Sequence, residues 1–419
     1  MKLNYKCTFF IGLAFMSISS FWQLYNYIIP LILKNTFQVT DDISGYVMAA
    51  DNVLAVLLLP LFGALSDKTH TRFGKRKPFI VAGTFLAAAL MLLIPYANTR
   101  KNLPMLILVL ALLLIVMSAY RSPAVALMPD VTPKPLRSKG NAVINLMGAL
   151  GGIFTYLVIT AFADHYTLIF AIVASFMVAC AVVLMLTIHE NRLVAQMPQE
   201  DPPAASEKTE GGPLPPAVKK SLLFLLLSVS LWFMAYNAVE TAYSRYVQDV
   251  WGKSESVGST MMIVAMLVAT ASYLPVGLLS AKLGRKKVIL GGVILMGAAF
   301  LTGFFLPHYS IAAYFIMGMI GIGWAAINVN SYPMVVEMSR GGNIGKYTGY
   351  YYTFSMAAQI LTPILSGYLF AYTPWGYHIM FPYAVFFTIL ALITMLFVHH
   401  GDNRPDQPQS KLELFDIED

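Results

Sequence analysis

The sequence is poor in charged residues and in cysteine. Only 12% of its 419 residues are Asp, Glu, Lys or Arg, whereas 58% are hydrophobic. A soluble domain typically carries about 25% charged residues, so this balance excludes an ordinary soluble protein. The two cysteines, Cys7 and Cys180, are far apart in apolar segments, so we expect neither a disulfide framework nor a metal site. The chain also lacks a phosphate-binding glycine loop, zinc-ligand spacing and a nucleophile motif, so we predict neither an enzyme nor a cofactor.

Long apolar runs fill most of the chain. A helix that spans a bilayer needs about 20 apolar residues, because its backbone amides must be satisfied within the segment. The runs that meet this length are 8–33, 43–66, 78–97, 103–127, 138–163, 165–188, 220–245, 255–280, 287–306, 310–336, 345–371 and 376–399. The first run is too long for a signal-peptide core and has no convincing cleavage site, so we expect it to be retained. The sequence therefore predicts an all-α membrane protein with twelve transmembrane helices.

Lys and Arg residues are distributed unevenly between the predicted loops. With both termini cytoplasmic, Arg121 lies within a helix and few of the 28 basic residues lie outside. The outer ones are Lys34, Arg100, Lys101, Arg245 and Lys253. This bias predicts a multi-pass protein of the cell membrane with cytoplasmic termini. It also accounts for the net charge of +7, so we expect the basic clusters to face membrane lipids and not nucleic acid.

A polar stretch divides the apolar runs into two sets of six. Residues 189–219 are rich in Pro, Gly and charge, which predicts a flexible cytoplasmic linker. The predicted units are therefore an N-terminal bundle (1–188), this linker, a C-terminal bundle (220–399) and a cytoplasmic tail (400–419).

The two halves share a direct repeat. The matching positions are Tyr25-Asn26 with Tyr236-Asn237, residues 63–66 with 277–280, and Asp130 with Glu337. These matches have a nearly constant offset, and each falls at the equivalent place on its predicted helix. The pattern predicts two pseudo-symmetric bundles that arose by duplication, with a substrate site between them.

The segment between the second and third runs carries the most specific motif. Residues 63–80 read GALSDKTHTRFGKRKPFI, with a cluster of basic residues beside Asp67. This pattern resembles the loop motif between helices 2 and 3 of the major facilitator superfamily. Residues 72–80 resemble in particular its sucrose-transporter and glycoside–pentoside–hexuronide symporter branches. The resemblance covers roughly residues 8–399 and implies two six-helix bundles that rock about a central site.

The resemblance also implies a cytoplasmic gate. Asp67 is expected to meet a helix N-terminus of the other half in the outward-facing state, where its charge would hold that side closed. Its equivalent in the second half is Ala281, so the lock is one-sided. Asp130 and Glu337 are expected to pair with the basic hairpin and with its repeat. The gating candidates are Gly63, Asp67, Arg72, Gly74, Arg76, Lys77, Asp130 and Glu337.

Three ionisable residues inside the apolar runs are candidates for ion coupling. Asp51 has only Asn52 as a polar neighbour in sequence, and desolvation would favour its neutral form and let it exchange a proton, unless it is a permanently bonded packing carboxyl. Arg121 would pair with Asp51 or Glu240, hold substrate hydroxyls, or form a structural salt bridge. Glu240 would face a central cavity or pair with Arg245 near the surface.

The expected coupling ion follows from a departure from the family pattern. In melibiose-type symporters two acids on helix 2 and one on helix 4 build a sodium site. The corresponding positions here are Ala55, Leu59 and Arg121. The resemblance therefore implies that the sodium site is missing and that the proton is the coupling ion.

Aromatic and amide residues suited to a sugar lie on the first, seventh, tenth and eleventh runs. Aromatic rings stack on a pyranose face, and amides hydrogen-bond its hydroxyls. The same residue types also serve as interfacial aromatics and helix-packing amides. The candidates are Trp22, Gln23, Tyr25, Asn26, Tyr236, Asn237, Trp324, Asn328, Tyr351 and Gln359.

Together these observations predict a monomeric secondary transporter that imports a glycoside or another small sugar with protons, by alternating access. One alternative is an exporter of amphipathic small molecules that works by proton antiport, since aromatic- and Met-rich helices suit a greasy cavity. Another is a non-transporting receptor or scaffold on the same fold. Concentrative uptake into proteoliposomes separates the transporters from the receptor, and the direction of the coupled pH change separates importer from exporter.

Overall fold

The computed structural model describes residues 3–133, 136–195, 214–338 and 344–402. Within these ranges the chain is built from helices, and no strand occurs. The helices of the N-terminal half are α1 (Tyr5–Asn35), α2 (Asp41–Lys68), α3 (Lys77–Thr99), α4 (Leu103–Asp130), α5 (Arg137–Ala161), α6 (Tyr166–Thr187) and the short α7 (Glu190–Ala195). Those of the C-terminal half are α8 (Pro216–Asp249), α9 (Glu255–Leu283), α10 (Arg285–Phe304), α11 (Ala312–Glu337), α12 (Ile344–Tyr372), the 3-10 turn η2 (Gly376–Ile379) and α13 (Met380–Leu396).

The twelve predicted runs each correspond to one long helix. Twelve helices of the described chain are long and apolar enough to cross a membrane, so the predicted fold class is confirmed. The largest difference concerns α8, which extends beyond the predicted run 220–245 at both ends. Pro216 suits the first turn of this helix, because a first-turn residue needs no amide hydrogen bond. As a result Arg245 lies inside a helix and not in a loop.

The segment predicted as a linker is structured where it is described. Its first residues form α7, and its last ones belong to α8. Residues 196–213 of the predicted linker and 403–419 of the predicted tail lie outside the described residues.

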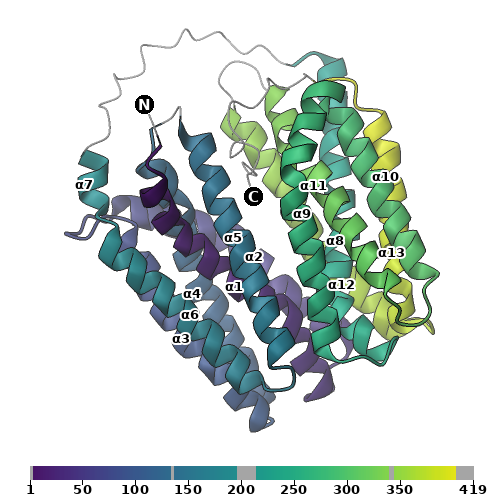
Figure 1. Ribbon diagram of the computed structural model, residues 1–419, viewed down its shortest axis with the longest axis horizontal. Helices are drawn as coiled ribbons and strands as arrows, with labels where there is room; N and C mark the ends of the chain where they lie inside the picture. The colour runs from purple at the N-terminus through teal and green to yellow at the C-terminus, as the bar shows by residue number, and fades with distance from the viewer. Residues whose placement is uncertain (1–2, 134–135, 196–213, 339–343, 403–419) are drawn as a thin grey trace.

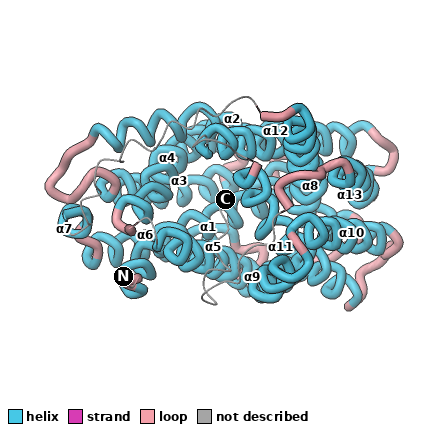
Figure 2. The backbone as a smooth tube through the Cα atoms, turned by 90° about the horizontal axis from the view of Figure 1, so that it is seen from above, coloured by secondary structure: helices cyan, strands magenta, loops and turns pink. Residues whose placement is uncertain are grey.

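The long helices form two bundles that lie side by side (Figure 1). Helices α1 to α6 make up one bundle, and α8 to α13 make up the other. Where the bundles meet, α2 packs on α12, α5 on α9 and α1 on α8; Figure 2 shows the first two pairs at opposite edges of the interface. The interface is therefore lined by helices of both halves, as the internal repeat predicts.

Hydrogen bonds and ion pairs join the bundles at the end away from the chain termini. We call this end the belt face, and the end that carries residues 69–76, 188–195 and 398–402 the terminal face. The belt contacts connect α1, α2, α5 and α6 with α8, α9, α12 and η2. The bundles are thus closed against each other at the belt face.

Two glycines allow this close approach. A Cβ atom added to Gly45 of α2 would collide with the backbone of Pro363 on α12, and one added to Gly367 of α12 would collide with the backbone of Asp41 on α2. Backbone atoms cannot move aside as a flexible side chain can. The two helices therefore depend on these glycines to pack at the belt face.

We predict that Gly45→Val opens the belt face. The added side chain should force α2 away from α12, and cross-linking between cysteines at positions 35 and 248 should fall several-fold. These positions suit the assay because Asn35 and Gln248 are hydrogen-bonded at 3.0 Å across the bundles. Gly291→Val is the control, since no atom lies within 4 Å of a Cβ added there. Equal cross-linking in both variants would contradict the close packing.

Candidate functional site

Arg76 is the centre of an ion-pair network on the terminal face. It lies at the N-terminus of α3 and is only 5% exposed. Its Nε donates to Asp130 Oδ2 at 2.8 Å, and its guanidinium also donates to Asp67 and Ser66 at the end of α2. The neighbouring Lys75 pairs with Asp130 at 3.1 Å. The predicted pairing of Asp130 with the basic hairpin is therefore present, and Asp67 contacts its own bundle.

Glu190 of α7 caps the N-terminus of α3, a contact that the sequence reasoning missed. Its carboxylate accepts hydrogen bonds from the backbone amides of Lys75, Arg76 and Lys77 at 2.9 to 3.0 Å. A carboxylate at this position satisfies amides that have no partner within the helix. Gly74, with φ of 114°, lies against the same side chain, and any Cβ there would collide with it.

The remaining gating candidates lie around this hairpin. The Gly63 carbonyl accepts from Arg76 at 3.3 Å, and Lys77 Nζ donates to the Ile188 carbonyl at 2.6 Å. Arg72 is exposed and stacks over the ring of Phe73.

The C-terminal bundle repeats the network in reduced form. Arg285 at the start of α10 pairs with Glu337, as predicted, and Asp402 accepts from the Lys286 amide at 2.7 Å. Gly284, with φ of 91°, takes the place of Gly74. The sequence held one signal for these two caps. Glu190 follows shortly after α6, and Asp402 follows shortly after α13, so each acid comes just after the last long helix of its bundle.

Asp51 and Arg121 lie near each other on the N-terminal bundle. The Asp51 carboxylate accepts from the Asn52 amide at 2.6 Å and from its side chain at 2.8 Å. Arg121 of α4 is close enough for its charge to act on Asp51, and its guanidinium lies 5.8 Å from the ring of Trp22. Among the described residues no carboxylate forms an ion pair with Arg121. The guanidinium is half-buried and is held by charge and ring contacts alone.

An aromatic stack occupies the C-terminal bundle. The rings of Tyr236 on α8 and Trp324 on α11 are parallel, with centroids 3.8 Å apart, and Phe233 meets Trp324 edge-on. Asn237, next to this stack in sequence, is 7% exposed, and its Nδ2 has no hydrogen-bond partner among the described residues. Tyr236 and Trp324, which the sequence predicted separately as substrate contacts, thus lie against each other.

A tyrosine on α5 links candidates from the two bundles. Tyr156 donates to Gln23 of α1 at 2.7 Å. Glu240 of α8 is close enough for its charge to act on the same hydroxyl. Tyr156 was not predicted as a site residue, because its contacts are visible only once α1, α5 and α8 are placed together.

The other residues predicted to contact substrate are either buried or half-buried. Tyr25 and Tyr351 are buried and bonded within their own bundles, to the Val47 carbonyl and the Ser331 hydroxyl respectively. The half-buried candidates are Trp22, Gln23, Asn26, Asn328 and Gln359.

Arg245 holds the bundles together at the belt face. It is 4% exposed, and it donates from α8 to Asp41 of α2 at 3.1 Å and to Ser44 at 3.4 Å. Tyr377 of η2 donates to the same carboxylate and lies under the guanidinium. The sequence placed Arg245 at the outer end of the predicted run 220–245 and offered Glu240 as one possible partner. In the structure α8 continues past residue 245, and Arg245 pairs with Asp41 of α2 instead.

A second pair lies beside it at the end of α1. Lys34 pairs with Asp249 of α8, and its ammonium also lies 4.2 Å from the ring centre of Tyr377. This pair is partly exposed, so it contributes less than the buried Arg245 pair.

Most of the chain matches one known protein family. The model of the Major Facilitator Superfamily matches residues 10–274 and 234–416. The chain belongs to this superfamily. It is therefore a multi-pass membrane transporter and not an enzyme.

Curated relatives match different shares of this chain. Proton-associated sugar transporter A of Mus musculus is 33% identical over 144 residues, which are 32% of this chain and 19% of the relative. A sucrose transport protein of Arabidopsis thaliana is 24% identical over 29% of this chain and 24% of its own length. An uncharacterized transporter of Methanocaldococcus jannaschii is 23% identical and matches 88% of this chain and 89% of its own. The facilitator thus spans about a fifth of the length of the first curated relatives it matches.

Solved structures share its fold. A bacterial homologue of the iron transporter ferroportin in an inward-facing state has a TM-score of 0.71 at 13% identity, covering 94% of this chain and 99% of the other. The transporter FucP in an outward conformation has a TM-score of 0.57 at 13% identity, covering 95% and 100%.

We predict that Glu190→Ala destabilises the facilitator more than Asp402→Ala. The first variant leaves three backbone amides without an acceptor, whereas the second removes one hydrogen bond. Loss of a helix cap costs about 1–2 kcal/mol, which should lower the melting temperature by roughly 2–4 °C. Thermal unfolding of both variants in detergent measures the difference. A smaller shift for Glu190→Ala would mean that α7 does not anchor the hairpin.

Proposed function

We propose that this facilitator is a proton-coupled symporter of a glycoside or another small sugar in the cell membrane, with its terminal face in the cytoplasm. The names of the partly matching relatives support a sugar and a proton, since they include a proton-associated sugar transporter and a sucrose transport protein. The excess of Lys and Arg at the terminal face supports the orientation.

The observation that carries the proposal is the arrangement of Asp51 and Arg121. Their charges interact, yet no hydrogen bond joins them. When Asp51 is ionised it attracts the guanidinium; when it is protonated that attraction is lost, and the planar fork of Arg121 is available to substrate hydroxyls. Proton binding and sugar binding would then favour each other, which is the coupling that symport needs.

The aromatic groups complete the proposed sugar site. Trp22 beside Arg121 offers a ring face on the N-terminal bundle, and the Tyr236–Trp324 stack offers one on the C-terminal bundle. Amides and hydroxyls for the sugar come from Gln23 and Tyr156, which already hydrogen-bond each other. A ligand held between both bundles would change its contacts whenever they rock.

The gate on the terminal face is part of the same proposal. With this face cytoplasmic, the closed belt makes the structure inward-facing. Asp67 is held here by Arg76, so its charge is engaged within one bundle. In the outward-facing state we expect Asp67 to meet a helix N-terminus of the other bundle and to close the cytoplasmic side.

We predict that Asp51→Asn abolishes uphill sugar accumulation and leaves counterflow intact. Exchange of labelled for unlabelled sugar needs no net change in protonation, so it should survive the loss of the carboxyl. Both rates are measured in proteoliposomes with an imposed pH gradient. Glu240→Gln is the matched comparison, because it also replaces a half-buried acid by its amide. Normal accumulation by Asp51→Asn would remove Asp51 from the coupling mechanism.

We also predict that uptake follows the pH gradient and ignores sodium. Ala55, Leu59 and Arg121 offer no carboxylate to a sodium ion. Adding sodium at fixed pH should leave the initial rate unchanged, whereas sugar addition should make the outer medium more alkaline. A tenfold stimulation by sodium would contradict the assignment of the proton, and acidification of the medium would indicate export.

A further inference from the structure

Glu255 is an acidic residue buried within the belt. It is the first residue of α9 and is 1% exposed. Tyr166 at the start of α6 donates a hydrogen bond to its Oε1, and Tyr27 of α1 donates to its backbone carbonyl at 2.8 Å. One residue of the C-terminal bundle is thus held by two tyrosines of the N-terminal bundle. These contacts exist only while the belt is closed.

Among the described residues no Lys or Arg forms an ion pair with this carboxyl. Its second oxygen, Oε2, has no hydrogen-bond partner among the described residues. Asp164 in the connection 162–165 adds a negative charge, and its backbone amide approaches the carboxyl without reaching hydrogen-bond geometry. The other titratable groups that face Glu255 are Tyr27 and Tyr166, which are neutral donors.

The cations of the belt are engaged elsewhere. Lys253, two residues before Glu255, lies 5.3 Å from the ring centre of Tyr309, and Lys34 pairs with Asp249. Burial without a neighbouring cation disfavours the charged form of a carboxyl. The closed belt therefore favours the protonated form of Glu255.

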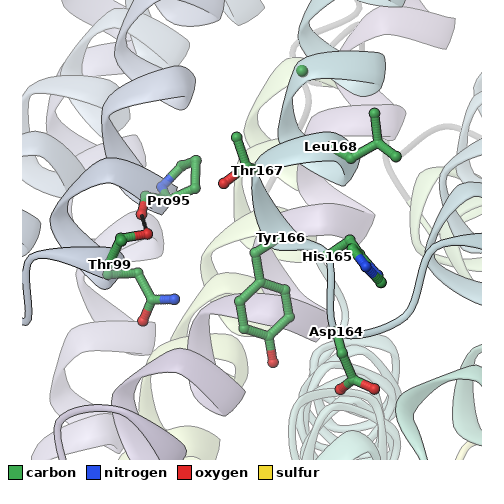
Figure 3. A pocket seen from close by; sticks show the side chains of 9 residues that line it. Pro95, Thr99, Asp164, His165, Tyr166, Thr167 and Leu168 are labelled. Carbon is green, nitrogen blue, oxygen red and sulfur yellow. Dashed lines mark hydrogen bonds between the residues drawn. The ribbon is translucent and has the colours of Figure 1, made fainter.

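A cavity lies beside the tyrosine that donates a hydrogen bond to this carboxyl. It has a volume of about 450 Å³ and lies between the end of α3 and the start of α6. Figure 3 shows Tyr166 on its wall, between Thr99 and Asp164. Asp164 and His165 at the cavity are exposed, whereas Tyr166 reaches inward to Glu255. Tyr166 thus both lines the cavity and contacts the carboxyl.

We propose that Glu255 is a second proton-binding site, filled when the belt closes and emptied when the bundles separate. A hydronium ion in the cavity would pass a proton to the Tyr166 oxygen while the Tyr166 hydroxyl proton moves to the Glu255 carboxylate. One O–H bond forms for each that breaks, and water is the only other product. Separation of the bundles would hydrate the carboxyl and release the proton to the same side. This proposal depends on the proposed transport cycle in one respect only: the belt face must be able to open and close.

The site makes belt closure depend on pH in a definite direction. The closed state binds the proton more tightly than the open state, so acid favours closure and base favours opening. Between the two ionisation points, the ratio of closed to open molecules should fall about tenfold per pH unit. With the belt face outside the cell, an acidic medium would drive the facilitator toward its inward-facing state.

The test measures belt opening directly in the purified protein, without any sugar. Spin labels are placed at Gln38 and Phe305, which are exposed on opposite bundles at the belt face, after replacement of Cys7 and Cys180. Distances between the labels are recorded from pH 4 to pH 9 by double electron–electron resonance. The parent should shift from a short to a long distance as the pH rises. Glu255→Gln, which is always neutral, should stay at the short distance throughout.

Two further variants separate Glu255 from its neighbours. Asp164→Asn should keep the transition. It should raise the closed-to-open ratio at high pH by less than tenfold, because it removes a negative charge near the carboxyl. Tyr166→Phe should move the midpoint to lower pH, because it removes a hydrogen bond that only the closed belt makes. A transition that persists unchanged in Glu255→Gln would overturn the proposal while leaving proton-coupled transport intact. A distance that is independent of pH in the parent would also overturn it.

Discussion

Charge inside a membrane-spanning protein must be neutralised where it lies, and this constraint organises the whole facilitator. On the terminal face Arg76 is surrounded by Asp67 and Asp130, and on the belt face Arg245 is held by Asp41. Taking one partner away would leave a buried charge uncompensated, which costs several kcal/mol. The paired clusters therefore hold helices together, whereas the proposed ligand and proton sites lie at the incompletely paired groups around Arg121 and Glu255.

The two faces use the same chemistry for different purposes. The terminal networks join helices within one bundle, as Glu190 does by capping α3 and Asp402 by capping α10. The belt contacts join helices of different bundles, as in the pair between Arg245 and Asp41. The first kind keeps each bundle rigid, and the second kind can open without disturbing either bundle. Rigid bundles with one separable interface are what rocking about a central site requires.

Much of this architecture was predictable from the sequence, because it follows from local patterns. Apolar length gave the twelve helices, and the repeat gave the equivalence of Asp130 and Glu337 with their basic partners. Contacts between the bundles were not predictable, because they join residues far apart in the chain. The sequence placed Arg245 only at the end of the run 220–245 and Glu255 only at the start of the run 255–280. Their contacts come from residues of the other bundle, Asp41 for Arg245 and Tyr27 and Tyr166 for Glu255. A chain that arose by duplication shows its two repeats in the sequence, but the sequence does not show how the two bundles pack together.

Alternation between the two faces is the central claim of this account, and paired distance measurements test it most directly. Spin labels at His70 and Lys282 report on the terminal face, and labels at Gln38 and Phe305 report on the belt face; all four residues are exposed. Asp41→Asn removes the carboxylate that holds Arg245 and should populate the belt-open state. If the two faces alternate, the belt distance then lengthens while the terminal distance shortens. A belt that opens with no change at the terminal face would contradict alternating access.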